Sequence, residues 1–195
     1  MSLLNAWIAP QEAVVVTDAI GQAADGSPLH ASKLVVVPHL GAIIALRGQL
    51  ALLTWLTVRA NSAGFATFDD LLDAMPGMLA EAEAAIDDHL NVLGGSAPGH
   101  EIIVAGWSDR QGRMIGRQFV KRDGMPASIE RDVDHHVSPW HASMDGLPLD
   151  PGGLEQLARG QALFMRTAFD AHCGGKLTIA RLTRGELNLQ TTEEI

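Results

Sequence analysis

Residues 101–120 read EIIVAGWSDRQGRMIGRQFV, two largely apolar runs separated by the polar turn 109–112. Ile, Val and Phe residues on both sides of a break that contains Asp and Gly are typical of a β-hairpin. Three further stretches of the chain have the same form and predict three more hairpins. They pair residues 4–9 with 13–19, 33–37 with 42–47, and 176–182 with 186–190.

Several of these runs are apolar without alternation. Residues 14–16 and 35–37 both read VVV, and residues 42–44 read AII. Strands of this kind are covered on both faces, whereas a strand with one wet face alternates between apolar and polar residues. Four hairpins supply eight strands, which is too many for one small open sheet. We therefore expect an α+β protein in which two antiparallel sheets pack face to face with helices outside them.

Helical patterns lie between the second and third hairpins. Residues 49–60 carry Leu and Trp at three- and four-residue spacing, as one face of a helix does. Thr67 precedes two acidic residues and has the character of an N-cap. The helix that follows Thr67 is predicted to be interrupted at Pro76 and to continue to about Asn91.

A last helix is predicted before the fourth hairpin. Asp150-Pro151 is a favourable start for a helix, which would then run towards Gly174-Gly175. Residues 122–149 show no clear period. No repeat or linker divides the chain, so we expect a single domain over residues 1–195.

The composition narrows the functional classes. Of 195 residues, 47% are hydrophobic and 19% are charged, which is globular composition with enough apolar mass for a core. The one cysteine, Cys173, excludes a disulfide framework and a zinc site of several cysteines, and it fits a reducing compartment. A net charge of −9 disfavours nucleic acid and anionic membranes as partners. Without a signal peptide or a long apolar run, a cytoplasmic location is expected.

The order of hairpins and helices resembles the proteasome β-subunit and bacterial HslV peptidase family, within the N-terminal-nucleophile (Ntn) hydrolases. Several short motifs occupy corresponding positions. They are the strand that ends at Asp18, the segment 32–34, the turn ALRGQLA at 45–51, the hairpin 101–119 and the loop 170–175. The resemblance implies a four-layer αββα sandwich. The long helix that the family has between these motifs is missing from residues 122–149, so one helical layer would be reduced.

The resemblance also assigns roles to single residues. Ser2 falls where the family has its terminal Thr, and Asp18 and Gly48 then align without a gap, with Lys33 displaced by one position. Removal of Met1 would expose the Ser2 amine, whose ordinary pKa of about 7.7–8.0 lets it act as the base for the Ser2 hydroxyl. Lys33 would favour the neutral amine, Asp18 would hold Lys33, and the Gly48 N–H would stabilise the oxyanion.

Two residues near the C-terminus would support this site. Asp170 matches a supporting Asp of the family, and Cys173 stands where the family has a supporting Ser. Helix capping explains these two positions equally well from the sequence alone.

Two functions follow from the resemblance. The first is an Ntn hydrolase that cleaves amide or peptide bonds through Ser2, with no cofactor and no metal. The second is a catalytically inactive assembly or binding subunit that keeps the fold, as proteasome α-type subunits do. Because the family forms rings, a homo-oligomer is expected in both cases.

Each candidate residue also has an ordinary explanation. Asp18 and Lys33 are equally compatible with a structural ion pair, and Ser is a common second residue. Cys173 can be a reactive thiol or, more commonly for a single Cys, a small buried apolar residue. Residues 132–136 and nearby His141 contain metal-binding side-chain types, but a polar surface loop accounts for them as well.

Overall fold

The computed structural model describes residues 2–23, 27–92, 99–125, 127–141, 144–171 and 173–195. In these ranges the strands form two five-stranded antiparallel sheets and one two-stranded sheet. The same ranges contain three α-helices and a 3-10 helix, η1 (Pro38–Leu40). The predicted α+β class with antiparallel sheets is confirmed.

The first sheet combines strands from both ends of the sequence, in the order β10-β1-β2-β11-β12. Its members are β1 (Leu4–Ala9), β2 (Glu12–Asp18), β10 (His135–Ser138), β11 (Lys176–Thr183) and β12 (Leu187–Glu194). Val15 lies opposite Ala6 on one side and Ala180 on the other. The N-terminal hairpin is therefore enclosed by strands that come much later in the chain.

The second sheet follows the order of the sequence, β5-β6-β7-β8-β9. Its members are β5 (Leu34–Val37), β6 (Ala42–Arg47), β7 (His100–Ser108), β8 (Arg113–Lys121) and β9 (Ile129–Asp132). The two-stranded sheet consists of β3 (Ile20–Gln22) and β4 (Pro28–His30). All four hairpins predicted from the sequence are present, and β3, β4, β9 and β10 are additional strands.

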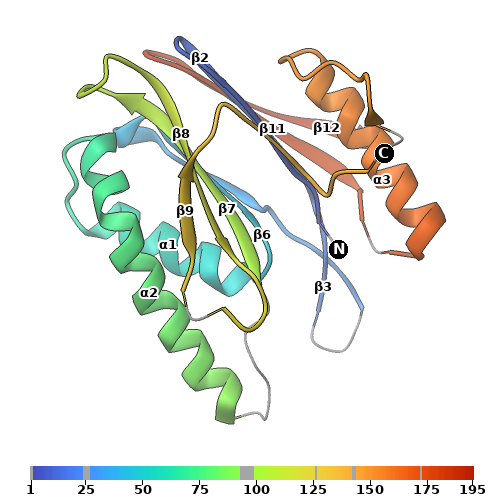
Figure 1. Ribbon diagram of the computed structural model, residues 1–195, viewed down its shortest axis with the longest axis horizontal. Coiled ribbons are helices and arrows are strands. Elements are labelled where there is room, and N and C mark those ends of the chain that lie inside the picture. The colour runs from blue at the N-terminus through green and yellow to red at the C-terminus, as the bar shows by residue number, and fades with distance from the viewer. Residues whose placement is uncertain (1, 24–26, 93–98, 126, 142–143, 172) are drawn as a thin grey trace.

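The helices cover the outer faces of the sheets, as Figure 1 shows. Helices α1 (Leu50–Ser62) and α2 (Phe68–Val92) pack on the second sheet through one apolar cluster, which includes Leu56, Leu71 and Val104. Helix α3 (Gly153–Phe169) packs on the first sheet through another. A third cluster, which includes Ala6 and Ile103, fills the space between the two sheets.

This arrangement explains why the VVV run of β2 does not alternate in polarity. Val15 belongs to the cluster between the sheets, whereas Val14 and Val16 belong to the cluster under α3. All three are fully buried. A strand that is covered on both faces has no position left for a polar side chain.

Two helix boundaries differ from the prediction. Helix α2 continues through Pro76 without interruption, because Met75, Met78 and Leu79 on both sides of the proline are anchored in the same apolar cluster. Helix α3 begins at Gly153 and ends at Phe169, short of the predicted Gly174.

The side chain of Asp150 binds the turn that leads into α3, whose N-cap residue is Gly152 rather than the predicted Asp150. Its Oδ1 accepts the Gly152 and Gly153 N–H groups at 2.9 and 2.8 Å. Groups of this kind at the first turn of a helix have no partner within the helix, so a capping carboxylate stabilises them.

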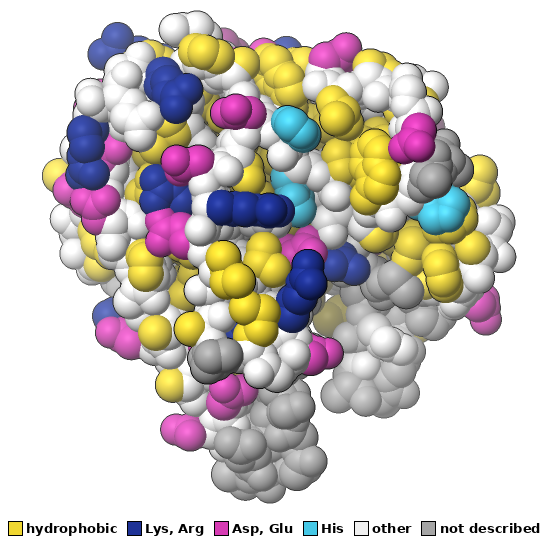
Figure 2. All heavy atoms as spheres, in the orientation of Figure 1, with side chains coloured by type: hydrophobic (Ala, Val, Ile, Leu, Met, Phe, Trp, Pro, Cys, Tyr) yellow, Lys and Arg dark blue, Asp and Glu magenta, His cyan; other side chains and the backbone are white. Residues whose placement is uncertain are grey.

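The surface carries charges of both signs. In the face shown in Figure 2, Lys and Arg side chains are interspersed with Asp and Glu rather than gathered into one basic field. Within the described part of the chain, no helix combines the length and the apolar character needed to cross a membrane.

Candidate functional site

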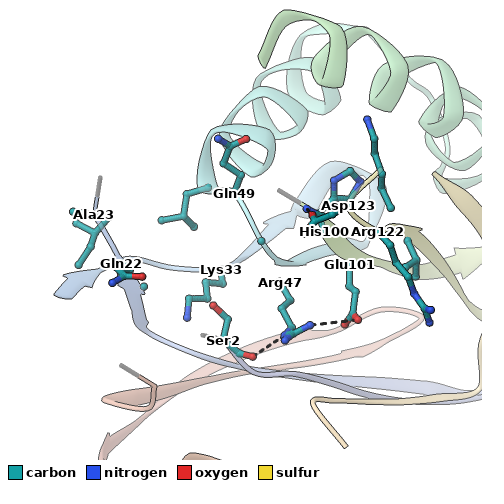
Figure 3. A pocket seen from close by; sticks show the side chains of 17 residues that line it. Ser2, Gln22, Ala23, Lys33, Arg47, Gln49, His100, Glu101, Arg122 and Asp123 are labelled. Atoms are coloured by element: carbon teal, nitrogen blue, oxygen red, sulfur yellow. Dashed lines mark hydrogen bonds and ion pairs between the residues drawn. The ribbon is translucent and has the colours of Figure 1, made fainter. Parts of the chain in front are cut away.

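A pocket of about 910 Å³ opens at one end of the two sheets. Strands β2 and β6 end there, and β5 and β7 begin there. The lining combines Ser2, which precedes β1, with residues of the second sheet, of the β3–β4 hairpin and of the connecting loops. Among them are Ser2, Gln22, Lys33, Arg47, Gly48, His100 and Glu101, most of which Figure 3 labels. The pocket therefore gathers Ser2, Lys33 and Gly48, three of the residues that the sequence singled out.

Asp18 lies beneath this pocket at the end of β2 and is fully buried. Its Oδ1 accepts the Leu3 N–H at 2.8 Å and lies 2.7 Å from the Lys33 Nζ. Its Oδ2 accepts the Gly174 N–H at 3.1 Å. A single carboxylate thus holds together the N-terminal segment, the start of β5 and the loop before β11.

Lys33 is 3% exposed and also donates to the carbonyl oxygen of Ile20. Burial lowers the pKa of the Lys33 ammonium below its usual value, although the charge and hydrogen bond of Asp18 oppose this effect. The nearby Arg47 charge lowers this pKa further. Lys33 therefore gives up a proton more readily than a surface lysine does.

Ser2 is half-buried at the rim of the pocket. Its carbonyl oxygen accepts the Arg47 Nε–H at 3.0 Å, and Arg47 in turn pairs with Glu101 at 3.4 Å, as Figure 3 shows. The Leu3 N–H on the other edge of the same peptide group is bound by Asp18. Met1, whose removal the hypothesis requires, lies outside the described residues.

Gly48 follows β6 with a φ of +140°, a conformation that side chains disfavour. A Cβ at this position would lie 2.8 Å from the His100 Cβ and 3.2 Å from the Gly99 carbonyl oxygen. Glycine is therefore required here both by the backbone angle and by the close approach of β7.

The two residues near the C-terminus differ in their placement. Asp170 is the C-cap of α3 in a left-handed conformation, and it is exposed. Cys173 is 2% exposed and close to the pair of Asp18 and Lys33. Burial, followed by the negative charge of Asp18, raises the pKa of the Cys173 thiol to about 12. This protonated, enclosed thiol does not fit the alternative of a reactive nucleophile.

The side chains of the histidine-rich segment, residues 132–141, make contacts other than those of a metal site. Asp132 pairs with Arg117 at 2.7 Å, His136 is buried 3.4 Å from Glu101, and His141 stacks on Phe164. In the part of the chain that the structure describes, no three His, Cys, Asp or Glu side chains gather as metal ligands would.

Arg47, Glu101 and His136 were not identified as site residues from the sequence. The signal available was the register of the second sheet, which places Arg47 directly opposite Glu101. Opposite charges on facing positions of neighbouring strands attract each other, but the register can be assigned only once the strands are known to pair.

No model of a known protein family matches this sequence, and no curated protein matches it either. The class of the protein therefore has to be inferred from its fold and from the geometry of this pocket.

Proposed function

We propose that this protein is an Ntn hydrolase of the proteasome and HslV type, which cleaves amide or peptide bonds with Ser2 as the nucleophile after removal of Met1. The proposal rests mainly on one observation, namely that Asp18 Oδ1 contacts two groups at once. It binds the Lys33 ammonium at 2.7 Å and the Leu3 N–H at 2.8 Å, next to a pocket that Ser2 and Lys33 both line.

The stacking of the elements supports the finer fold assignment. Helices α1 and α2, the second sheet, the first sheet and helix α3 succeed one another through three apolar clusters. In the described ranges only α3 covers the outer face of the first sheet, which agrees with an αββα sandwich with one reduced helical layer.

The proposed chemistry needs no group beyond the chain itself. The Ser2 Oγ forms a bond to the substrate carbonyl carbon while its proton passes to the Ser2 α-amine. The C–N bond of the tetrahedral intermediate then breaks, and the same proton passes to the leaving nitrogen. Water attacks the resulting ester in the same way, so that the acid is released and the Ser2 hydroxyl is restored.

Two neighbours assist these steps. The positive charge of Lys33 favours the neutral form of the amine, which is the form that accepts the proton. The Gly48 N–H is the proposed donor to the oxyanion, because Gly48 lies at the rim of the same pocket as Ser2. We further propose a cytoplasmic homo-oligomer, as the resemblance to ring-forming peptidases implies.

The decisive experiment uses protein whose intact mass shows that it begins at Ser2. Hydrolysis of a panel of peptides and aryl amides should be abolished by Ser2→Ala. It should fall by about 10²–10⁴-fold in Lys33→Met and in a variant with extra residues before Ser2. Ser62→Ala, at the exposed end of α1, is the matched control and should keep full activity.

Two results would refute the proposal. If activity survives both Ser2→Ala and the N-terminal extension, the nucleophile lies elsewhere. If protein that begins at Ser2 hydrolyses nothing in the panel, the chain is better explained as an inactive assembly or binding subunit.

A further inference from the structure

A line of polar side chains leads away from Ser2 into the space between the two sheets. Arg47 donates through Nε to the Ser2 carbonyl oxygen at 3.0 Å, and its Nη1 lies 3.4 Å from Glu101 Oε1. Figure 3 shows Arg47 between the two residues, with both interactions drawn. The second oxygen of Glu101 lies 3.4 Å from Nε2 of His136, which belongs to the other sheet.

The hydrogen bonds beyond Glu101 determine which nitrogen of His136 carries the proton. Arg131 can only donate, and its Nε donates to Gln118 Oε1, so the amide nitrogen of Gln118 faces His136. That nitrogen is 3.2 Å from His136 Nδ1, which must therefore accept. The proton of the neutral ring then resides on Nε2, the nitrogen that lies 3.4 Å from Glu101 Oε2.

Glu101 is consequently held as an anion. Burial would raise the pKa of this carboxyl, but the neighbouring His136 and Ser138 side chains and the charge of Arg47 outweigh burial and lower it to about 2. An ionised Glu101 holds the Arg47 side chain in a charge-assisted contact, so that the guanidinium does not turn out into solvent.

The Ser2–Leu3 peptide group is thereby bound at both edges. Arg47 binds its carbonyl oxygen, and Asp18 binds its N–H. Because a peptide group is planar, fixing both edges fixes the plane and so restricts rotation about the adjoining bond of Ser2. The amine and hydroxyl of Ser2 are attached to the atom on the other side of that bond.

We propose that Arg47 and Glu101 are positioning residues for the Ser2 site, with Arg47 orienting the Ser2–Leu3 peptide group and Glu101, anchored by His136, holding Arg47 in place. This inference rests on the proposed function only for its kinetic consequence. The orientation of Ser2 and the proximity of the Arg47 charge exist whether or not the protein is a hydrolase.

The positive charge of Arg47 should also affect the protonation of the Ser2 amine, which a purely structural role would not do. Ionisable groups close to the N-terminal segment include Asp18 from β2, Lys33 before β5, Arg47 from β6, Glu101 from β7 and Cys173 before β11. His100, Lys121, Arg122 and Asp123 line the same pocket as Ser2. Removing a cation from this set favours the protonated amine, and removing an anion favours the neutral amine.

The test compares four variants of protein beginning at Ser2: Arg47→Met, Arg47→Lys, Glu101→Gln and the control Arg159→Met, which affects only an exposed pair with Glu155. Two quantities are measured. One is the pH profile of kcat and KM on the best substrate of the panel, and the other is the titration of the Ser2 α-amine by competitive acylation with a trace of acetic anhydride. Thermal unfolding confirms that each variant is folded.

We expect Arg47→Met to lower kcat by about 10–100-fold, with KM nearly unchanged, and to move the amine titration to higher pH. Arg47→Lys keeps the charge and should leave the titration in place while kcat still falls. Glu101→Gln should move the titration to lower pH. Arg159→Met should match the parent protein in both measurements.

The two proposals fail in distinguishable ways. A folded Arg47→Met or Arg47→Lys protein with the parent kcat and the parent amine titration overturns the positioning role. If the parent protein has no activity, the hydrolase proposal is lost and the titration of the Ser2 amine alone tests the positioning role. Opposite shifts of that titration in Arg47→Met and Glu101→Gln then support the positions of Arg47 and Glu101 beside Ser2. If Arg47→Met does not fold, Arg47→Lys and Glu101→Gln carry the same test.

Discussion

The Lys33 ammonium lies 2.7 Å from the Asp18 carboxylate, with 3% of the lysine side chain and none of the aspartate side chain exposed. A pair buried to this degree is costly to form but more costly to break, because either partner alone is an uncompensated charge in the interior. The carboxylate also holds two backbone N–H groups, so the effect of breaking the pair extends to three segments of the chain.

Lys33→Met should therefore destabilise the fold by about 3–5 kcal/mol. The substitution keeps most of the side-chain volume and leaves Asp18 buried without its counter-charge. Urea denaturation measures the loss. Arg110→Met is the control, because the pair of Arg110 and Asp73 is 62% exposed on each side and should contribute far less to stability than the buried pair does. If Lys33→Met and Arg110→Met lowered the free energy of unfolding equally, burial would not be what makes the Asp18–Lys33 pair important for stability.

Glu101 should make stability depend on acid pH. Its pKa lies at about 2 in the folded protein, below the usual 4.5, because the neighbouring His136 and Ser138 side chains and the Arg47 charge outweigh the effect of burial. A depressed carboxyl pKa stabilises the fold fully above the usual value and loses that contribution as pH falls through the folded value. The contribution is on the order of 3 kcal/mol.

Unfolding free energies measured from pH 6 to pH 2 should consequently fall less steeply in Glu101→Gln than in the parent protein. Glu155→Gln, which removes a half-exposed carboxylate on α3, should keep the parent slope. Parallel curves for the parent and Glu101→Gln would show that this carboxylate has an ordinary pKa in the folded protein.

The Cys173 thiol should be inert in the folded protein. With a pKa of about 12 it has roughly 10³-fold less thiolate at pH 8 than an ordinary cysteine, in addition to being buried. Alkylation by iodoacetamide, followed by intact mass, should be negligible in buffer and complete in urea. The chain has one cysteine, so a single mass increment reports on this residue. Rapid labelling without denaturant would contradict this prediction and would support Cys173 as a reactive nucleophile.

Gly48→Ala should cost more stability than Gly41→Ala. Both glycines have positive φ values, +140° and +54°, so both substitutions incur conformational strain of about 1–3 kcal/mol. Only at Gly48 does the new Cβ also meet backbone and Cβ atoms of a neighbouring strand, which adds an overpacking cost of about 1–3 kcal/mol. Thermal unfolding of the two variants compares them directly. A smaller loss at Gly48 would mean that β7 can move away.

Local sequence patterns were sufficient to predict the four hairpins and the sites of the three helices. Their strands are apolar, and their turns contain Gly, Pro or Asp. The uninterrupted α2 was not predictable in this way. A proline inside a helix costs about 3 kcal/mol, and only the packing of Met75, Met78 and Leu79 against the second sheet compensates for it.

The strands β9 and β10 were missed for a different reason. Each has four residues, and β9 reads IERD with every residue exposed, so no apolar period marks it. β10 is a strand because it lies beside β1, more than a hundred residues away in the sequence. The contact of His136 with Glu101 was missed as well, because the two residues lie in separate sheets and such partners share no local pattern.

Because the first sheet combines strands from both ends of the given sequence, its topology also sets the order in which the parts of the protein can fold. The second sheet uses residues 34–132 in sequence order, so it can form while the chain is still being synthesised. β2 has to wait for β11, which begins at Lys176, and it stays unpaired along one edge until β11 has left the ribosome. Non-local pairing of this kind slows folding and leaves an apolar strand open to wrong partners. The segment that carries Ser2 is thus made before the second sheet but is locked into place only after β11 has been made.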